Sequence, residues 1–561
     1  MDIVNRWGWI RVSLRSDTYR SVKRHARNCG PGHLWRFQST IDRIERRGEI
    51  EASGRKYCSR SLLGTSLNVE SAEYSYDEPV KFGPQNVGGL VLNLRCNGSK
   101  DGSISNPLYE PINTRTTTHF AVRKTWNHDD RESSLSSLFF SGQQDSPTNV
   151  TQLVFGISGS VKAWRDRRSY FKEWWRPNVT RGYIFFDKEP TPDLLPWPSE
   201  ELPPYRVSEN TTGFEVYSRH VKPFVIRIVR TILETFREGD KGVRWYVMGD
   251  DDTIFFLDNL VELLGRYDHT KYFYIGGISE CVKSNFDFSF EMAFGGAGFA
   301  LSYPLAEALV ANLDQCIGIY PFYHVSDQIL SACIADLGVP LTPEKGFHQI
   351  DLVHDISGFL SAHLQAPLIS LHHLDIALPI FPTMNRHESV THLMNAAKLD
   401  QSRLLQQTVC YHTENNWAFS IAWGYSAYIY EQCIPRSILR RPLETFTPWS
   451  LKRQPPDYMF NTRLMSNHPC ETPHVFFFRS ITRNNNNEIV MTYTRSKHRR
   501  LPPCSSNHSA DHISKIRVYT PATKLNFAEN RGECCDVLKF DGNVTAEVKI
   551  RGCTKTEIVA S

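Results

Sequence analysis

Three adjacent aspartates, Asp250, Asp251 and Asp252, follow an apolar run that begins at Trp245. Burying unpaired anions side by side is costly, so such a cluster persists most easily where a hard divalent cation neutralises it. The apolar run predicts a buried strand, and open α/β sheets bind ligands at the carboxyl ends of their strands. An exposed turn that caps the helix predicted over 258–265 is the alternative. The sequence favours a metal site at a sheet edge.

The length of 561 residues exceeds the usual size of one domain, about 100 to 200 residues. Little periodicity is visible in the first part of the chain, whereas strand and helix patterns follow it. We expect a poorly ordered or divergent N-terminal region over 1–149, an α/β domain over 150–400 and a β-rich, cysteine-containing region over 401–561. The net charge of +4 gives no strong field, so nucleic-acid binding is disfavoured.

Strand and helix patterns alternate in the middle of the chain. A short apolar strand over 153–157, aromatic residues at near-helical spacing over 164–175 and a second strand over 182–186 are typical of a parallel α/β unit. Ser302 precedes another helical pattern and carries an N-cap signal. After about residue 400, aromatic and β-branched runs such as 417–423 predict strands.

The chain contains 13 cysteines, whose C-terminal set lacks the paired two-residue spacing of zinc sites. A disulfide framework formed in an oxidising compartment is the better interpretation. Cys316 and Cys333 bracket Asp327, and we expect them to form a bridge. The C-terminal set comprises Cys470, Cys504, Cys534, Cys535 and Cys553.

No stretch of about 18 apolar residues occurs, so the sequence predicts no transmembrane helix. The Arg-rich residues 1–29 show no clear signal peptide or anchor, since their apolar run is short and broken. Glycosylation sequons favour a lumenal location only weakly, and they occur at Asn97, Asn149, Asn178, Asn210, Asn507 and Asn543.

Two motifs downstream of the aspartates involve glycines and a lone acid. In Phe294-Gly-Gly-Ala-Gly-Phe299 the glycines let the backbone approach a ligand closely, although a tight turn is the plainer interpretation. Asp327 precedes an apolar helical pattern. It is either an N-cap or a general base that the helix holds in place.

Two adjacent histidines, His372 and His373, follow the strand-like run 367–370. A single histidine in an apolar run is usually structural, but an adjacent pair makes a metal ligand more plausible. Adjacent side chains on a strand point to opposite faces, so we expect only one of the two to face the site.

In this order the motifs resemble those of the Fringe-like beta-1,3-glycosyltransferases, most closely the plant Fringe-related proteins of uncharacterised function. The resemblance covers about residues 150–480. It implies an α/β fold of the GT-A type, a Rossmann-like mixed sheet flanked by helices, with a β-rich C-terminal extension. The segments that carry it are 245–256, 295–299, 327, 338–342, 346–349, 370–375 and 416–417.

The resemblance implies a metal-dependent inverting hexosyltransferase. Such an enzyme moves a hexose from a UDP-sugar donor to a hydroxyl of a glycan or glycoprotein acceptor, with a beta-1,3 linkage, and uses Mn²⁺ or Mg²⁺. It also implies a lumenal Golgi location. Relatives are usually anchored by an N-terminal helix, so membrane association is expected from the family although no such helix is visible in this chain.

By the same resemblance, Asp252 binds the metal directly, while Asp250 and Asp251 assist at the metal or at the donor's ribose. His373 completes the protein ligands, with His372 as the less favoured alternative. The imidazole and the carboxylates are thus expected to converge on one cation that stabilises the departing nucleotide.

Asp327 occupies the position of the family's catalytic base, and Gly295, Gly296 and Gly298 form the floor where donor and acceptor meet. Many plant relatives carry a second acidic residue directly after the base, whereas this chain has Gln328. That departure and the missing anchor favour an alternative, a catalytically weak or inactive member that binds a nucleotide sugar or glycan.

A phosphohydrolase with Asp250 as its nucleophile is a third hypothesis. Such enzymes usually carry Thr or Val two residues past the second aspartate of their motif, and Ile254 stands there in this chain. No later lysine and acidic-pair signature supports this hypothesis, so it is disfavoured.

Overall fold

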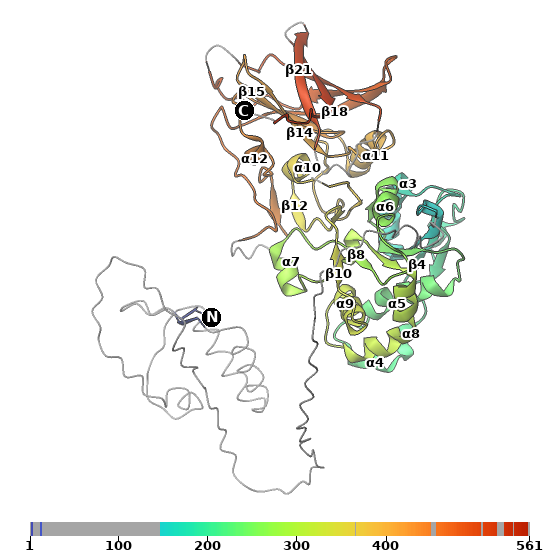
Figure 1. The fold of residues 1–561 in the computed structure, drawn as a ribbon. Coiled ribbons are helices and arrows are strands. Elements are labelled where there is room, and N and C mark those ends of the chain that lie inside the picture. Colours follow the sequence, from blue (N-terminus) through green and yellow to red (C-terminus); the bar gives the residue numbers. More distant parts are fainter. Residues whose placement is uncertain are drawn as a thin grey trace, which may run out of the picture. The chain divides into compact units, whose positions relative to one another are not determined.

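The computed structural model describes residues 146–558 except 365, 450–455, 506–508, 524–531 and 542–543. It also describes two short antiparallel strands, Asp2–Ile3 (β1) and Val12–Ser13 (β2). The chain divides into two compact units, Met1–Ser136 and Ser137–Ser561, and all that follows concerns the second (Figure 1). The poor order expected over 1–149 lies almost entirely outside the described residues.

A seven-stranded mixed sheet forms the first half of this unit, in the order β10-β8-β9-β6-β3-β4-β5. Strand β9 runs antiparallel to β6 and β8, and the other neighbours pair in parallel. The alternation of strands and helices therefore gives the α/β architecture expected from the sequence. The strands are Leu153–Ser158 (β3), Arg181–Phe186 (β4), Tyr205–Val207 (β5), Trp245–Asp250 (β6), Tyr274–Gly276 (β8), Phe299–Ser302 (β9) and Leu341–Pro343 (β10).

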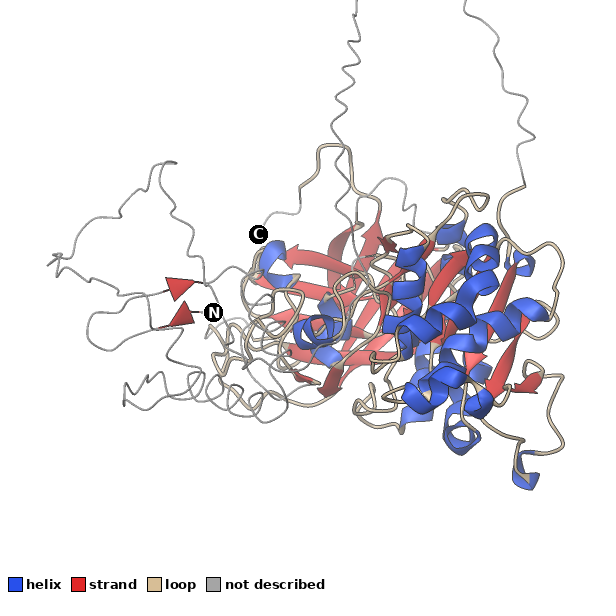
Figure 2. Ribbon diagram, turned by 90° about the horizontal axis from the view of Figure 1, so that it is seen from below, coloured by secondary structure: helices blue, strands red, loops and turns tan. Residues whose placement is uncertain are grey.

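Helices cover both faces of this sheet (Figures 1 and 2). Leu153 and Phe155 on β3 belong to one hydrophobic core with helices Val161–Trp174 (α3) and Leu257–Leu264 (α6). Val154 belongs to a second core on the opposite face, because successive side chains of a strand alternate. That face is covered by Val225–Arg237 (α5), Tyr303–Ile319 (α8) and Ser326–Asp336 (α9). Burial on both faces explains the continuous apolar runs.

Helix α8 follows Ser302 as predicted, but the serine makes no side-chain cap. Its hydroxyl oxygen instead accepts from the backbone N–H of Phe273, 3.0 Å away. The disulfide between Cys316 and Cys333, predicted from the sequence, joins α8 to α9.

The unit also contains two small sheets. One has the order β11-β13-β7 and the other pairs β12 with β17. Their strands are Ile254–Phe255 (β7), Phe347–His348 (β11), Leu352–His354 (β12), Ser370–Leu371 (β13) and Phe446–Pro448 (β17). The other helices of the described residues are Val150–Gln152 (η2), Pro192–Leu194 (η3), Thr211–Gly213 (η4), Glu215–Arg219 (α4), Val282–Asp287 (α7), Gly295–Ala297 (η5), Ser357–Ala362 (α10), Arg386–Ala397 (α11) and Arg436–Leu439 (α12).

The C-terminal half is an eight-stranded sheet in the order β14-β15-β16-β18-β19-β20-β22-β21. Its edge strands β14 and β21 also contact each other and are joined by the Cys410–Cys535 disulfide, so the sheet curls on itself. Phe155 and Val548 belong to the same hydrophobic core, which therefore runs through both halves. The strands are Gln407–His412 (β14), Trp417–Ala422 (β15), Ser426–Tyr430 (β16), His474–Arg483 (β18), Glu488–Arg495 (β19), Lys515–Pro521 (β20), Cys534–Asp541 (β21) and Thr545–Arg551 (β22).

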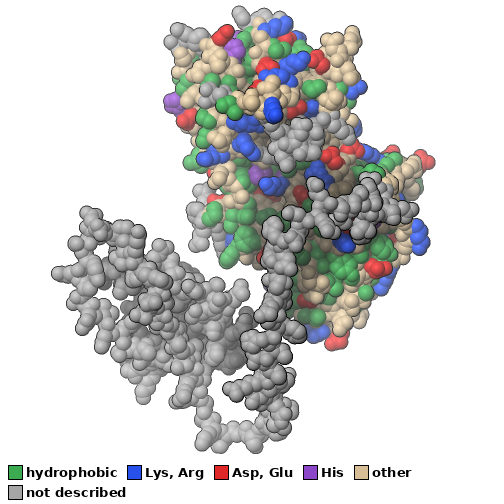
Figure 3. All heavy atoms as spheres, in the orientation of Figure 1, with side chains coloured by type: hydrophobic (Ala, Val, Ile, Leu, Met, Phe, Trp, Pro, Cys, Tyr) green, Lys and Arg blue, Asp and Glu red, His purple; other side chains and the backbone are tan. Residues whose placement is uncertain are grey.

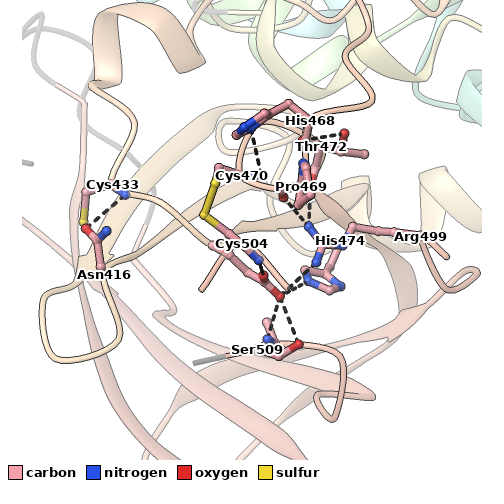
Figure 4. The surroundings of a disulfide bond; sticks show 12 residues. Asn416, Cys433, His468, Pro469, Cys470, Thr472, His474, Arg499, Cys504 and Ser509 are labelled. Atoms are coloured by element: carbon pink, nitrogen blue, oxygen red, sulfur yellow. Dashed lines mark hydrogen bonds and ion pairs between the residues drawn. A yellow bond between two sulfur atoms is a disulfide. The ribbon is translucent and has the colours of Figure 1, made fainter. Parts of the chain in front are cut away.

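Further disulfides confirm the framework expected from the C-terminal cysteines: Cys470–Cys504, drawn in Figure 4, and Cys534–Cys553. Beside the former, the buried carboxylate of Glu431 accepts from the backbone N–H of Cys504 at 2.7 Å and lies 2.9 Å from Arg499. Burial opposes its ionisation, but His474 and the backbone donors lower the pKa of Glu431 to about 2. This carboxylate and the disulfide together hold the segment around Cys504 in place.

On the face drawn in Figure 3, basic and acidic side chains are interspersed over the described surface. Within the described part of the chain, no helix combines the length and apolar character needed to cross a bilayer. Among the sequon asparagines, three are exposed: Asn149, Asn178 and Asn210. Asn97, Asn507 and Asn543 fall outside the described residues.

The disulfide that joins the two sheet edges gives a stability prediction. Replacing both Cys410 and Cys535 by serine removes a cross-link between residues 125 apart in sequence. It should lower the free energy of unfolding by about 2–4 kcal/mol, because the unfolded chain gains freedom. Cys433→Ser, which removes a thiol that forms no disulfide, is the control. Equal denaturant midpoints for the double variant and this control would contradict the prediction.

Candidate active site

The acidic trio lies at the carboxyl edge of the central sheet, where Asp250 is the last residue of β6. The backbone N–H of Asp251 donates to the carbonyl of Ser158 on the neighbouring strand β3, at 3.1 Å. The hydroxyl of Thr253 accepts from the backbone N–H of Asp250 at 2.9 Å. Asp251 and Asp252 are each 2% exposed, whereas Asp250 is partly exposed. A tight turn therefore buries these carboxylates just past the strand.

A strand pairing brings a distant histidine to this turn. Strand β7, which directly follows the acidic turn, pairs antiparallel with β13 in a register that sets Ile254 opposite Leu371. His372 comes directly after β13 and is thereby carried back toward the aspartates. Its Nε2 atom lies 3.1 Å from Oδ1 of Asp252, a residue 120 positions earlier in the chain.

Asp250, Asp252 and His372 form a group that could hold a metal ion. One ligand atom from each lies within 4.8 Å of the others. The buried Nδ1 of His372 has no hydrogen-bond partner within the described residues, so this ring is not committed to a structural network on that side. Two carboxylates and an imidazole suit a divalent cation such as Mn²⁺. The donor set fits the metal that the family resemblance implied.

His373, the histidine that the family resemblance favoured, lies outside that group. Its Nδ1 atom is 3.2 Å from a carboxylate oxygen of Asp351. The expectation that adjacent histidines point to opposite faces does not hold, since β13 ends at Leu371 and His373 has a φ of +57°. The rings of His372 and His373 stack instead, with centroids 3.8 Å apart. The structure thus brings His372, rather than His373, to the aspartates.

The electrostatics of the cluster show what neutralises it without a cation. Although Asp250 is partly exposed as a residue, desolvation of its carboxylate raises its pKa to about 7, and burial raises the pKa of Asp251 to about 6. Burial also opposes ionisation of Asp252, but His372 and Arg167 hold its pKa well below the usual range. Burial lowers the pKa of His372, yet Asp252 and Asp250 raise it overall to about 9. The cluster therefore retains protons that a bound divalent cation would displace.

Arg167 on α3 is a site residue that lies outside the motifs singled out in the sequence. Its guanidinium lies 2.7 Å from Asp251, 3.0 Å from Asp252 and 2.8 Å from Asp375. Burial opposes its charge, but Asp252 and Asp251 hold the pKa of Arg167 above its ordinary value. The guanidinium thus fixes the orientation of both buried carboxylates.

A sequence signal for Arg167 does exist. Trp164, Phe171 and Trp174 form the buried stripe of α3, and Arg167 occupies the same stripe at helical spacing. A charged side chain in the apolar register of a helix needs a buried partner. The aromatic residues predict the helix, and the arginine among them indicates a buried acidic partner.

The glycine-rich turn, which contains η5, is held by side chains from three other motifs. Thr253 donates its hydroxyl to the carbonyl of Gly296 at 2.8 Å. The backbone N–H of Ala297 donates to the side-chain oxygen of Gln349 at 2.8 Å, and its carbonyl accepts from the hydroxyl of Ser370. The motifs that lie far apart in sequence therefore converge on this turn.

The glycines permit close approach to the site's side chains. A Cβ at Gly296 would lie 2.0 Å from the imidazole of His372, and one at Gly295 would lie 2.6 Å from Oδ1 of Asp327. Gly298 has a φ of +81°, which L side chains rarely adopt. Each predicted glycine therefore has a steric reason of its own.

Asp327 lies in the first turn of α9, whose N-cap position is Val325, so the alternative of an N-cap role does not apply. Its Oδ2 accepts from the backbone N–H of Gly295 at 2.8 Å, and its Oδ1 accepts from the hydroxyl of Ser326 at 3.1 Å. Asp327 and Asp250 line one cavity. Burial raises the pKa of Asp327, which makes its carboxylate a better proton acceptor.

Comparison with known proteins finds similarity to a family of unknown function and, over part of the chain, to beta-1,3-glucosyltransferases. Residues 284–535, less than half of the chain, match a family described as a protein of unknown function, DUF604. The chain is 31% identical over 132 residues to a beta-1,3-glucosyltransferase of Homo sapiens, and 27% identical over 145 residues to one of Mus musculus. These matches cover 23% and 26% of this chain, and only 25% and 29% of those relatives.

Among solved structures, the chain is similar to the mannosyltransferase PcManGT from Pyrobaculum calidifontis in complex with GDP-Man and Mn²⁺. The sequence identity is 9% and the TM-score 0.20, with 36% of this chain and 62% of that chain covered. At this TM-score the two structures do not correspond closely enough for their sites to be compared.

The packing of His372 against Gly296 gives a prediction. Gly296→Ala should displace the imidazole, weaken cation binding and lower stability by about 1–3 kcal/mol through overpacking. Thermal unfolding with and without Mn²⁺ measures both effects. Gly318→Ala is the matched control, because a Cβ there meets nothing within 4 Å. If Gly296→Ala melts and responds to Mn²⁺ as the control does, the packing account is wrong.

Proposed function

We propose that this protein is a metal-dependent inverting glycosyltransferase with a GT-A-type domain over 150–400. It moves a hexose from a UDP-sugar to a hydroxyl of a glycan or glycoprotein, with a beta-1,3 linkage. The convergence of Asp250, Asp252 and His372 beside the cavity of Asp327 carries this proposal. The similarity to beta-1,3-glucosyltransferases supports the reaction class and makes UDP-glucose the first donor to test.

In this proposal Asp252, Asp250 and His372 hold the cation. Mn²⁺ or Mg²⁺, when bound, neutralises the negative charge that builds on the departing nucleoside diphosphate. Arg167 keeps Asp251 and Asp252 in fixed positions through its ion pairs at 2.7 and 3.0 Å. Because these side chains are already oriented, little reorganisation is needed when the leaving group acquires charge.

Asp327 is the proposed general base. Inversion requires an acceptor hydroxyl to attack the anomeric carbon from the face opposite the leaving group, and a carboxylate within hydrogen-bond reach must take its proton. The Gly295 N–H and the Ser326 hydroxyl hold the Asp327 carboxylate in place. The glycine-rich turn beside it is the proposed floor where donor and acceptor meet, and its lack of side chains leaves space for His372 and Asp327.

Gln328 favours a second candidate function, binding of a nucleotide sugar or glycan without turnover. Its amide nitrogen donates to the carbonyl of Phe288 at 3.2 Å, so this side chain ties a loop. Because its side chain is an amide, Gln328 supplies no second carboxylate beside Asp327. Release of UDP from a UDP-sugar by the wild-type protein would separate the two functions, since only the transferase breaks the glycosidic bond.

We also propose that the protein acts in the Golgi lumen. The disulfides of both halves support an oxidising compartment, because reducing compartments keep most thiols free.

The two histidines can be distinguished by cation binding. Asp252→Ala and His372→Ala should abolish the rise in melting temperature caused by Mn²⁺, whereas His373→Ala should retain it. Asp252→Ala should also abolish UDP release from UDP-glucose. Retention of the Mn²⁺ effect in His372→Ala, with its loss in His373→Ala, would return the ligand role to His373.

The base can be tested with Asp327→Asn, which keeps the side-chain shape but removes proton acceptance. We expect Mn²⁺ and UDP binding to remain near wild-type levels, while transfer falls by about 10²–10⁴-fold. Steady-state transfer rates and calorimetric UDP binding measure the two effects. Wild-type transfer by this variant would remove Asp327 from the mechanism.

A further inference from the structure

A stack of three rings leads from the candidate metal site to the protein surface. The rings of His372 and His373 have centroids 3.8 Å apart and an interplanar angle of 30°. The ring of His373 in turn stacks on Trp449, at 5.0 Å and 13°. Trp449 is 45% exposed. A large aromatic face is thus presented to solvent two rings away from a candidate metal ligand.

Several interactions hold this stack in position. The backbone N–H of Trp449 donates to the carbonyl of Asp351 at 2.9 Å, where β12 and β17 pair. The Asp351 carboxylate lies 3.2 Å from Nδ1 of His373 and accepts from the hydroxyl of Ser279 at 2.6 Å. Asp351 therefore fixes both the imidazole and the segment that carries the indole.

The backbone of His373 is strained where it joins the stack. Its φ of +57° is uncommon for a residue with a side chain. Such conformations persist where the surrounding structure imposes them, and they cluster at functional sites. Without this turn the His373 ring would leave the stack, because continued strand alternation would direct it to the opposite face.

Two kinds of flat ligand can stack on an exposed indole: a nucleobase or the apolar face of a pyranose ring. Nucleotides bind open α/β sheets beyond the carboxyl ends of parallel strands, here β3 and β6. In the strand order, β3 and β8 lie on opposite sides of β6. Asp351, which holds the stack, contacts Ser279 shortly after β8, so the stack lies on the β8 side. The position of Trp449 therefore favours a sugar over the base.

We propose that Trp449 is the platform on which a pyranose ring of the acceptor stacks, held at a fixed distance from the cation site by His373. This inference rests on the proposed transferase function and adds a specificity-determining residue to it. The indole supplies a rigid, amphipathic surface at low entropic cost, as tryptophans commonly do at binding hot spots.

Saturation-transfer NMR tests the platform without requiring turnover. The probes are methyl pyranosides of glucose, galactose, mannose, N-acetylglucosamine, xylose and fucose, offered with UDP and Mn²⁺. At least one should bind the wild-type protein, and Trp449→Ala should weaken that binding by roughly tenfold. Trp449→Phe should retain most of it. Tyr272→Ala is the control, because this aromatic residue is 52% exposed and precedes β8 at the opposite sheet edge.

Three results would overturn the proposal: no pyranoside binds the wild-type protein, Trp449→Ala binds as tightly as wild type, or Trp449→Ala loses uridine binding instead. The Mn²⁺ effect on melting should persist in Trp449→Ala, and its loss would assign Trp449 to support of the metal site. Failure of the transferase function would appear separately, as absence of UDP release while Trp449-dependent pyranoside binding remains.

Discussion

Buried carboxylates at the end of β6 require opposite charge around them, and the structure supplies it from distant segments. Arg167 comes from α3 and His372 from the end of β13, each within 3.1 Å of Asp252. The pairing of β7 with β13 brings the histidine into reach. This compensation is what allows the acidic turn to be buried in the folded protein. A divalent cation would complete it by displacing the protons that the cluster retains.

The same region joins the motifs to one another. Thr253, Gln349, Ser370 and Asp327 all hydrogen-bond to the glycine-rich turn, so the metal group and the proposed base share one backbone segment. A shift of this turn would move His372 and Asp327 together. The proposed cation site and base are therefore positioned as a unit, which the in-line geometry of an inverting transfer requires.

Sequence patterns were sufficient for the α/β sheet, the placement of the acidic trio at its edge and the Cys316–Cys333 bridge. They could not choose between His372 and His373, because strand periodicity fails where a residue adopts a left-handed conformation. The role of Arg167 depends on Asp251 and Asp375, which lie 84 and 208 residues away in the sequence. Helical spacing indicates that Arg167 needs a buried acidic partner, but it specifies neither which carboxylates pair with Arg167 nor the strand register that places His372.

The central claim is that one cation is held by Asp250, Asp252 and His372. Anomalous scattering from a crystal of the protein with Mn²⁺ and UDP tests it most directly. We expect an anomalous peak for a manganese ion that is coordinated by Asp252 and His372 and lies beside Asp250. The diphosphate should bind the side of the ion that these residues leave open. Coordination of the manganese ion by His373 instead of His372, or a diphosphate bound away from the acidic turn, would contradict this cation site.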